Sequence, residues 1–235
     1  MSGRVVLVTG GNRGIGLGIA QAFAANGDRV AVTHRGSGAP DGLFGVECDV
    51  TSGEQVEAAF SAIEAEFGPV EVLVSNAGIT DDTLLLRMSE ESFDRVIDAN
   101  LAGAYRVAKR AVQGMLRARR GRLIFVSSVV AFVGSPGQAN YAASKAGLVG
   151  LSRSIAREIG SRSITSNVIA PGFIDTDMAA AMSEARRSEV LASVPLKRYG
   201  TVEEIAGAAL YLASDAAAYV TGAVLPVDGG VGMGL

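Results

Sequence analysis

Tyr141 and Lys145 are four residues apart, and Ser128 precedes the tyrosine by thirteen residues. On a helix, residues four apart share one face, so the ammonium group of the lysine can lie near the phenol. A nearby cation favours the phenolate and lowers the pKa of a tyrosine from its ordinary value of about 10. A serine hydroxyl aimed at the same oxygen would stabilise negative charge that develops there. The three residues therefore predict general acid catalysis, with Tyr141 as the proton donor.

The same spacing occurs a second time, because Tyr105 and Lys109 are four residues apart and Ser92 precedes Tyr105 by thirteen. The two sets differ in context. Ser128 follows an apolar run, residues 123–126, that predicts a buried strand, and ligands bind at the ends of such strands. Ser92 lies in a hydrophilic segment that predicts a solvated helix start, and Tyr105 and Lys109 continue that helix. We predict that the first set is catalytic and that the second pair is structural.

Asn100 lies inside the same predicted helix as the second pair. An asparagine there is ordinarily a surface residue or marks a kink. If the helix bends at this point, a freed carbonyl could bind a water that links Lys145 to solvent and replenishes the proton. The sequence leaves both interpretations open.

A glycine-rich turn, Thr-Gly-Gly-Asn-Arg-Gly-Ile-Gly at residues 9–16, follows the first apolar run and opens the first helical pattern. Glycines there let the backbone turn sharply and approach a pyrophosphate, which then lies against the helix N-terminus. The spacing differs from the plain G-x-G-x-x-G pattern. The predicted cofactor contacts in this turn are Gly10, Asn12, Arg13, Gly14, Ile15 and Gly16.

The end of the second predicted strand carries His34 and Arg35, where an NAD enzyme normally has an acidic residue for the ribose hydroxyl. Arg35 and Arg13 together offer two guanidinium groups and no carboxylate, which suits a 2′-phosphate. The sequence therefore favours NADP(H), with His34 and Arg35 at the adenosine ribose. The alternative is that Arg35 is solvated surface.

Two further strand ends carry candidate cofactor residues. Asp49 and Val50 end the third strand, where a carboxylate could accept a hydrogen bond from the adenine amino group. Asn76, Ala77 and Gly78 follow the fourth strand, where small residues would leave room for the cofactor. The carboxyl ends of parallel strands meet at the edge where open α/β sheets bind ligands, so these five residues are predicted to line the same site.

Seven short apolar runs alternate with helical patterns along the chain, and most runs are continuous, as in strands buried on both faces. Capping boxes at Thr51/Glu54 and Thr201/Glu204 mark two helix starts. The alternation predicts one α/β domain over residues 1–235, with a doubly wound, mostly parallel seven-stranded sheet and helices on both faces. The predicted strands are Arg4–Val8, Val30–Thr33, Leu43–Glu47, Val70–Ser75, Arg122–Ser127, Ile164–Ile169 and Ala223–Val227. The predicted helices are Ile15–Asn26, Ser52–Phe67, Ser92–Arg117, Tyr141–Ile159 and Val202–Ala213.

Composition narrows the function classes. Hydrophobic residues make up 49% of the chain and charged residues 19%, which argues against disorder. The net charge is −3, so nothing suggests nucleic acid or an anionic membrane as a partner. The one cysteine, Cys48, and the one histidine, His34, argue against disulfides, metal clusters and a Ser-His-Asp hydrolase. No secretion signal or uninterrupted apolar span is visible, so we expect a soluble, cytoplasmic protein without a metal site.

Taken together, these motifs resemble those of the short-chain dehydrogenase/reductase family over essentially the whole chain. The motifs are Thr9-Gly10-x-x-x-Gly14-x-Gly16, Asn76-Ala77-Gly78, Asn100, Ser128, Tyr141-x-x-x-Lys145 and Pro171-Gly172. The resemblance implies a Rossmann fold and a catalytic tetrad of Asn100, Ser128, Tyr141 and Lys145, the last two also contacting the cofactor. It further implies that residues 171–176 form the nicotinamide-side loop, with Pro171, Gly172, the Ile174 backbone near the carboxamide and Thr176 near the phosphates. Ser75 departs from the second asparagine found in many members, a small and conservative change.

Within the family, the chain is similar to 3-oxoacyl-[acyl-carrier-protein] reductases, and among these to the mycobacterial type that serves the mycolic acid pathway. Residues 138–145, 171–178 and 226–230 carry the broader similarity, and residues 33–38 and the Gly-Met-Gly tail carry the narrower one. The implied reaction in fatty acid elongation reduces a 3-oxoacyl thioester of acyl carrier protein, or of CoA, to the (3R)-3-hydroxyacyl thioester with NADPH. The implied assembly is a homotetramer, a dimer of dimers, that pairs through the long helices and the C-terminal strand.

Two surface features bear on the substrate, and each has a plain structural alternative. Residues 175–198 are a candidate lid whose apolar side chains could take an acyl chain or could be ordinary helix packing. Those side chains are Met178, Ala179, Ala180, Ala181, Met182 and Leu191. An arginine cluster could steer an acidic carrier protein or could be solvated. Its members are Arg117, Arg119, Arg120, Arg122 and Arg162.

Two other functions stay open. One is a reductase or dehydrogenase of the same family that acts on a sugar, a steroid or a short CoA ester. The other is a non-catalytic NADP-binding sensor on the same fold, against which the complete tetrad argues.

Overall fold

Seven strands form one sheet in the order β3-β2-β1-β4-β5-β6-β7 in the computed structural model, which describes residues 3–175 and 184–233. Every neighbouring pair of strands is parallel. The strands are β1 (Val5–Val8), β2 (Arg29–His34), β3 (Phe44–Glu47), β4 (Val72–Ser75), β5 (Gly121–Val126), β6 (Ile164–Pro171) and β7 (Val224–Val227). The predicted seven-stranded, doubly wound α/β fold is therefore confirmed.

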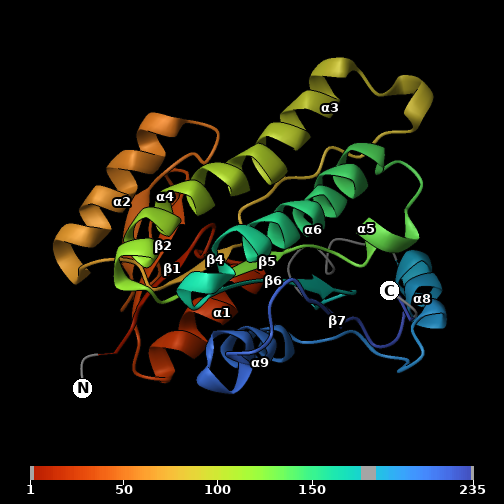
Figure 1. Cartoon of the computed structure of the whole chain (residues 1–235). Helices are drawn as coiled ribbons and strands as arrows, with labels where there is room; N and C mark the ends of the chain where they lie inside the picture. The colour runs from red at the N-terminus through yellow and green to blue at the C-terminus, as the bar shows by residue number, and fades with distance from the viewer. Residues whose placement is uncertain (1–2, 176–183, 234–235) are drawn as a thin grey trace.

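Helices connect the strands and cover both faces of the sheet (Figure 1). They are α1 (Gly14–Ala25), α2 (Gly53–Phe67), α3 (Glu90–Ile97), α4 (Gly103–Ala118), α5 (Val130–Val133), α6 (Ala139–Ile159), α8 (Glu184–Ser193) and α9 (Val202–Ala213). A π-helical segment, η2 (Asp98–Ala102), joins α3 to α4, and short 3₁₀ turns lie at η1 (Leu85–Arg87), η3 (Gly160–Arg162) and η4 (Asp215–Ala217). No helix in these described ranges is long and apolar enough to cross a membrane.

Alternate residues of β1 belong to two different cores, because successive side chains of a strand point to opposite faces of the sheet. Val5 and Leu7 pack in the cluster formed with α2, α4 and α6, whereas Val6 and Val8 pack in the cluster formed with α1 and α9. Figure 1 shows these two groups of helices on opposite sides of the strands. Burial on both faces explains why the β1 sequence is continuously apolar.

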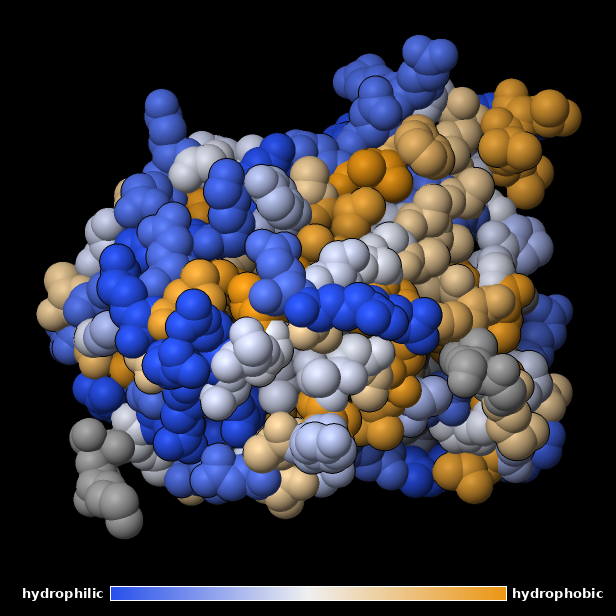
Figure 2. Space-filling view, viewed as in Figure 1, coloured by the Kyte–Doolittle hydropathy of each residue, from blue (hydrophilic) through white to orange (hydrophobic). Residues whose placement is uncertain are grey.

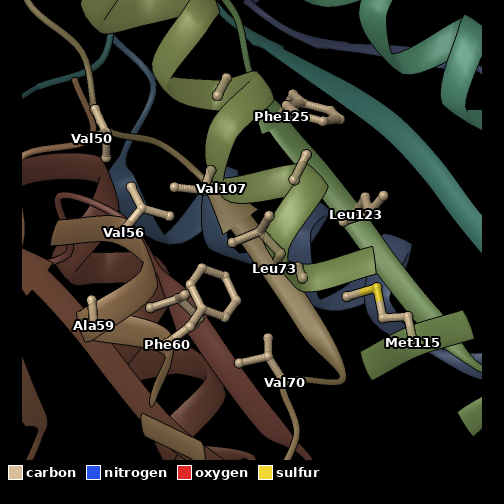
Figure 3. Packing of buried hydrophobic residues seen from close by; sticks show 14 of the residues in the cluster. Val50, Val56, Ala59, Phe60, Val70, Leu73, Val107, Met115, Leu123 and Phe125 are labelled. Carbon is tan, nitrogen blue, oxygen red and sulfur yellow. The ribbon is translucent and has the colours of Figure 1, made fainter. Parts of the chain in front are cut away.

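Apolar side chains from α2, α4 and the sheet pack together in the core beneath these helices (Figure 3). Phe60 of α2 and Met115 of α4 are each 1% exposed, and both lie in the same cluster as Leu73 of β4 and Leu123 of β5. Burying one such side chain stabilises the fold by about 1.5–3 kcal/mol. This packing holds the strands in place and thereby the residues that follow them.

Two local predictions need correction. The helix predicted over residues 92–117 is interrupted by the π segment, which inserts one extra residue into the turn. The capping box predicted at Thr51 does not form, because Ser52 caps α2 by accepting from the Gln55 amide, while the Thr51 hydroxyl donates to Asp49. The box between Thr201 and Glu204 forms as predicted.

The chain reverses its direction of winding between β1 and β4. From β1 it proceeds outward to β2 and β3, and then returns to place β4 on the other side of β1. At such a switch point, the loops that follow the two central strands diverge and leave a crevice at the carboxyl edge of the sheet. The functional residues discussed below follow these strands.

Candidate active site

A cleft of about 590 Å³ lies along the carboxyl ends of the strands. Its lining includes all the predicted cofactor residues that the structure describes, from the glycine-rich turn to the loop after β6. These are Gly10, Asn12, Arg13, Gly14, Ile15, Gly16, His34, Arg35, Asp49, Val50, Asn76, Ala77, Gly78, Tyr141, Lys145, Pro171, Gly172 and Ile174. Thr176 and the lid residues 178–182 fall outside the described residues.

The glycine-rich turn brings backbone close to backbone at the start of α1. Gly10 has φ +63°, and a Cβ there would lie 3.1 Å from the Ala77 Cα. A Cβ on Gly16 would lie 2.4 Å from the Gly10 carbonyl oxygen, a distance that no side chain tolerates. Arg13, the N-cap of α1, makes no side-chain cap, so the first amides of the helix can bind an anion.

Thr9 and Asn76 brace this turn from below. The Thr9 hydroxyl oxygen accepts from the amides of Asn76 and Ala77, both at 3.0 Å. The Asn76 side-chain amide donates to the carbonyl oxygens of Thr9 at 3.0 Å and Gly10 at 3.1 Å. Asn76 was predicted because small residues leave room for a cofactor, and its observed contacts show a second role, holding the turn in shape.

Cations and one carboxylate gather at the other end of the cleft, after β2 and β3. Arg13 and Arg35 are exposed, and neither forms an ion pair within the described part of the chain. The amide of Thr51 and, less strongly, the charge of Arg35 lower the pKa of Asp49, so this carboxyl is ionised at neutral pH. Two guanidinium groups that form no ion pair, one of them at the open N-terminus of α1, can hold phosphate groups.

Ser128 and Tyr141 meet in the middle of the cleft. Ser128 follows β5, where its Oγ accepts from the Val130 amide at 3.2 Å, and it is hydrogen-bonded to the Tyr141 hydroxyl. Burial raises the pKa of Tyr141; the bond to Ser128 opposes this shift, and the charge of Asp82 adds to it. The sequence predicted a lowered pKa, and that prediction is wrong for this arrangement because desolvation of the phenolate dominates.

Lys145 lies over the face of the Tyr141 ring. Its Nζ donates to the Val126 carbonyl oxygen at 2.9 Å and lies 5.7 Å from the ring centre. The side chain is 4% exposed, and burial lowers its pKa to about 8. The chain therefore places a lysine that can change protonation state near neutral pH directly behind the tyrosine.

Asn100 lies behind the cleft wall, with its side chain fully engaged. Its Oδ1 accepts from the Ile79 amide at 2.8 Å, and its Nδ2 donates to the Ile79 carbonyl and to Ser144 Oγ, each at 3.0 Å. Ser144 Oγ in turn donates to the Tyr141 carbonyl oxygen at 2.7 Å. Asn100 is thus 1% exposed and ties the loop after β4 to the helix of the tyrosine. The sequence left open whether Asn100 is a surface residue or marks a bend in the helix, and the structure places it in the π segment.

The second tyrosine–lysine pair lies on the surface. Tyr105 is 48% exposed, and Lys109 is also exposed on α4. Neither residue lines the cleft. The prediction that this pair is structural agrees with its position.

The cleft also contains residues that the sequence did not single out. Thr33 is buried and its Oγ1 accepts from the Gly10 amide at 3.1 Å, and Ser127 Oγ donates to the Lys145 carbonyl oxygen at 2.8 Å. Both residues are adjacent in sequence to predicted site residues, and this adjacency could have indicated that they lie in the cleft. Phe173 lies within the predicted nicotinamide-side loop, whereas Tyr199 had no such signal, because it reaches the cleft through contacts with the loop after β6. The other unpredicted lining residues are Cys48, Ile79, Thr80, Ala99 and Val126.

Cys48 is a buried free thiol. Burial, together with the charge of Asp49, raises its pKa to about 11. The thiol is therefore protonated at neutral pH and a poor nucleophile.

The predicted arginine cluster lies at the wrong edge of the sheet for this cleft. Arg119, Arg120 and Arg162 precede β5 and β6, at the amino edge, and a six-residue strand spans about 20 Å. Arg122 is buried within β5, and Arg120 pairs with Asp215 at 3.2 Å. A carrier docked there would not face this chain's own cleft.

Comparison with known proteins finds one family and several close relatives over nearly the whole chain. The profile of a family described as "Enoyl-(Acyl carrier protein) reductase" matches residues 10–232. The 3-oxoacyl-[acyl-carrier-protein] reductase MabA of Mycobacterium tuberculosis is 60% identical over 231 residues, which cover 98% of this chain and 94% of the relative. MabA of Mycobacterium avium is 58% identical, with 98% and 91% covered. The 3-oxoacyl-[acyl-carrier-protein] reductase FabG of Escherichia coli is 47% identical over 239 aligned positions, with 98% of each chain covered.

Proposed function

The chain belongs to the short-chain dehydrogenase/reductase family, whose members use a nicotinamide cofactor, and from this we propose that it is an NADPH-dependent 3-oxoacyl-[acyl-carrier-protein] reductase. The reaction would convert a 3-oxoacyl thioester to the (3R)-3-hydroxyacyl thioester in fatty acid elongation. The observation that carries the proposal is the contact of the Ser128 and Tyr141 hydroxyls in the same cleft as the open N-terminus of α1. The identities of 60% and 47% with such reductases support the choice of substrate.

The cofactor residues fit a dinucleotide with a 2′-phosphate. The uncapped first turn of α1 and the close backbone approach at Gly10 suit a pyrophosphate. Arg13 and Arg35 lie in the cleft and form no ion pair in the described chain, although the charge of Arg35 acts on Asp49, and β2 ends in His34 where NAD enzymes have an acidic side chain. These features support NADPH over NADH.

The proton chemistry follows from the environment of Tyr141. When bound, the cofactor supplies the hydride that reduces the ketone carbon. Ser128 and Tyr141 would hold the ketone oxygen between their hydroxyls, and Tyr141 would give its proton to that oxygen. A raised pKa suits this direction, because the tyrosine must be protonated before it can act as an acid. Lys145, with a pKa of about 8, would return a proton toward the tyrosine side of the cleft.

We propose that Asn100 completes the tetrad by positioning. Its amide group fixes Ile79 and, through Ser144, the Tyr141 turn of α6. A Cβ on Gly78 would lie 3.1 Å from Asn100 Oδ1 and 3.4 Å from Lys145 Nζ, so both groups border the space beside this glycine. Asn100 would therefore support the loop and the helix turn that lie next to Lys145.

A homotetramer is part of the proposal. Leu84, Leu85 and Leu86 are 60%, 73% and 100% exposed around η1. Figure 2 shows hydrophobic side chains gathered at the end of the molecule where Figure 1 places η1 and the start of α3. The strand β7 also has a free edge, since β6 is its only neighbour in the described sheet. Apolar patches and open edges of this kind are what subunit contacts cover.

Oxidation of NADPH with a panel of thioesters tests the function. We expect turnover with 3-oxoacyl groups on acyl carrier protein and on CoA, slower turnover with NADH, and none with the matching trans-2-enoyl thioesters. Preference for the enoyl substrates would replace ketone reduction by double-bond reduction. Preference for a sugar or steroid ketone would keep the chemistry and overturn the substrate.

A further inference from the structure

Tyr199 has a buried hydroxyl with no hydrogen-bond partner in the part of the chain that the structure describes. Two other buried polar side-chain atoms there share this condition, in Arg122 and Thr165, and both lie near the amino edge of the sheet. Tyr199 differs from them because it lines the cleft. A buried hydroxyl without a hydrogen-bond partner lowers the stability of the fold by about 1–3 kcal/mol. Its presence beside a binding cleft therefore points to a ligand that pairs with it.

The backbone around Tyr199 is held firmly. Arg198 donates to the Tyr199 carbonyl oxygen at 3.0 Å, and Glu204 binds Arg198 at 2.6 and 2.8 Å while capping α9. The next residue, Gly200, donates to the Phe173 carbonyl oxygen and accepts from the Asp175 amide, each at 2.9 Å. The position of the tyrosine is therefore fixed against the loop after β6.

Neighbouring contacts place Tyr199 between the two structures that frame the middle of the cleft. Gly200 pairs with Ile174 of the loop after β6. Val202, three residues after the tyrosine, packs against α1, because a Cβ on Gly18 would lie 2.9 Å from the Val202 Cβ. Tyr199 thus lies beside the loop after β6 and near the first turns of α1, whereas Arg35 follows β2, which β1, β4 and β5 separate from β6.

We propose that the Tyr199 hydroxyl donates a hydrogen bond to the nicotinamide-side phosphate of the bound dinucleotide. The inference rests on the proposed function, because it requires a dinucleotide in the cleft. The first turn of α1 would bind a phosphate group of the dinucleotide, and the oxygens of that phosphate accept hydrogen bonds. The phenol of Tyr199 has one O–H that can donate to such an oxygen. Tyr199 is then a residue for cofactor affinity and takes no part in proton transfer.

The variant Tyr199→Phe removes the hydroxyl and keeps the ring, which packs 5.6 Å from the Arg187 guanidinium. We expect the variant to melt at a slightly higher temperature than the parent without ligand, because the unpaired hydroxyl is gone. We expect its Kd for NADPH to rise about three- to thirty-fold by titration calorimetry. Tyr211→Phe is the matched control, since Tyr211 is 45% exposed on α9 and lies outside the cleft lining.

Three ligands locate the contact. NADPH and 2′-phospho-ADP-ribose both contain the nicotinamide-side phosphate and should lose the same affinity in Tyr199→Phe, whereas 2′,5′-ADP lacks that phosphate and should bind as before. Loss with NADPH alone would move the contact to the nicotinamide ring, and equal loss with all three would indicate general damage; either result overturns the proposal. An unchanged Kd for NADPH together with a raised KM for the ketone would also overturn the proposal, because the hydroxyl would then contact the substrate. Because these titrations need no turnover, they stay decisive if the enzyme proves to reduce another substrate.

Discussion

The Nζ atom of Lys145 lies 5.7 Å from the centre of the Tyr141 ring, the same distance that separates Lys109 from the ring of Tyr105. The two pairs are therefore alike in spacing and in local geometry. They differ in exposure to solvent. Lys145 is 4% exposed, whereas Lys109 is exposed and Tyr105 is 48% exposed on the outside of α4. Burial shifts the pKa values of the first pair, which makes it chemically distinct.

The pH dependence of the reduction should report on Lys145. Its pKa of about 8 predicts that kcat/KM for the ketone falls as the pH rises through this value, because the lysine loses the proton it supplies. Tyr141 stays protonated over the same range, since its pKa is raised. Initial rates between pH 6 and 10 at saturating NADPH would measure the profile. A rate that stays flat to pH 10 would exclude this role for the lysine.

Replacing Lys145 by methionine should stabilise the fold at neutral pH. The folded chain holds the lysine proton with a pKa of about 8, against 10.5 for a lysine exposed to water, so the unfolded chain binds more protons between these values. Stability of the parent therefore rises with pH across this window, and the buried charge costs up to about 3 kcal/mol below it. Loss of the bond to Val126 offsets part of the gain, leaving about 1–2 kcal/mol at pH 7.

Urea unfolding of parent and Lys145→Met at pH 7 and pH 10.5 tests this, and the advantage of the variant should shrink at the higher pH. The Cys48 thiol changes the free energy of unfolding in the opposite direction. Because its pKa is raised in the folded chain, the protein loses stability as the pH rises from about 9 to about 11. That contribution is common to both proteins and cancels in the difference. A variant that is less stable than the parent at pH 7 would contradict the account.

Asn100→Ala should destabilise the protein by about 2–4 kcal/mol, because the partly buried amide and carbonyl of Ile79 and the buried hydroxyl of Ser144 would lose their partner. The variant should also lower kcat more than it raises KM, since Ser144 and the Tyr141 turn lose their support. Asn26→Ala provides the control, because Asn26 is exposed at the end of α1 and should change stability by less than about 0.5 kcal/mol. Equal effects of the two substitutions on stability would refute the bracing role.

Arg35→Ala should weaken NADPH binding about ten-fold and leave NADH binding nearly unchanged, because the guanidinium would lose only its contact to the 2′-phosphate. Arg13→Ala should show the same selectivity. Arg153→Ala on α6 is a suitable control, since that arginine is exposed and lies outside the cleft lining. If both cofactors lose affinity to the same degree, neither arginine selects for NADP.

The strands and the cofactor turn were predictable because their signals are local. Val5–Val8 is continuously apolar and is followed at once by the glycines of residues 10–16, so strand, turn and helix appear in order along the chain. Parallel strands then bring the ends of β1, β2, β4 and β5 to one edge without further information.

Other features depend on contacts between distant segments. Tyr199 reaches the cleft because Gly200 pairs with Ile174, which no pattern near residue 199 indicates. The direction of the Tyr141 pKa shift needed the burial of its ring, and the burial of Arg122 within β5 removed it from the surface cluster. In the sequence, only Asn100 indicated the π segment at Asp98–Ala102. The hydrogen bonds that Asn100 makes with Ile79 and Ser144 join distant parts of the chain, so no local pattern predicts them.

The matched substitutions Tyr141→Phe and Tyr105→Phe test the central claim most directly, because each removes one hydroxyl from a ring whose centre lies 5.7 Å from a lysine Nζ. Turnover of a 3-oxoacyl thioester should fall at least about 100-fold in Tyr141→Phe, the usual contribution of a general acid, while the Kd for NADPH stays close to that of the parent. Tyr105→Phe should keep both. Full turnover in Tyr141→Phe, or an equal loss in both variants, would contradict the assignment of Tyr141 as the proton donor.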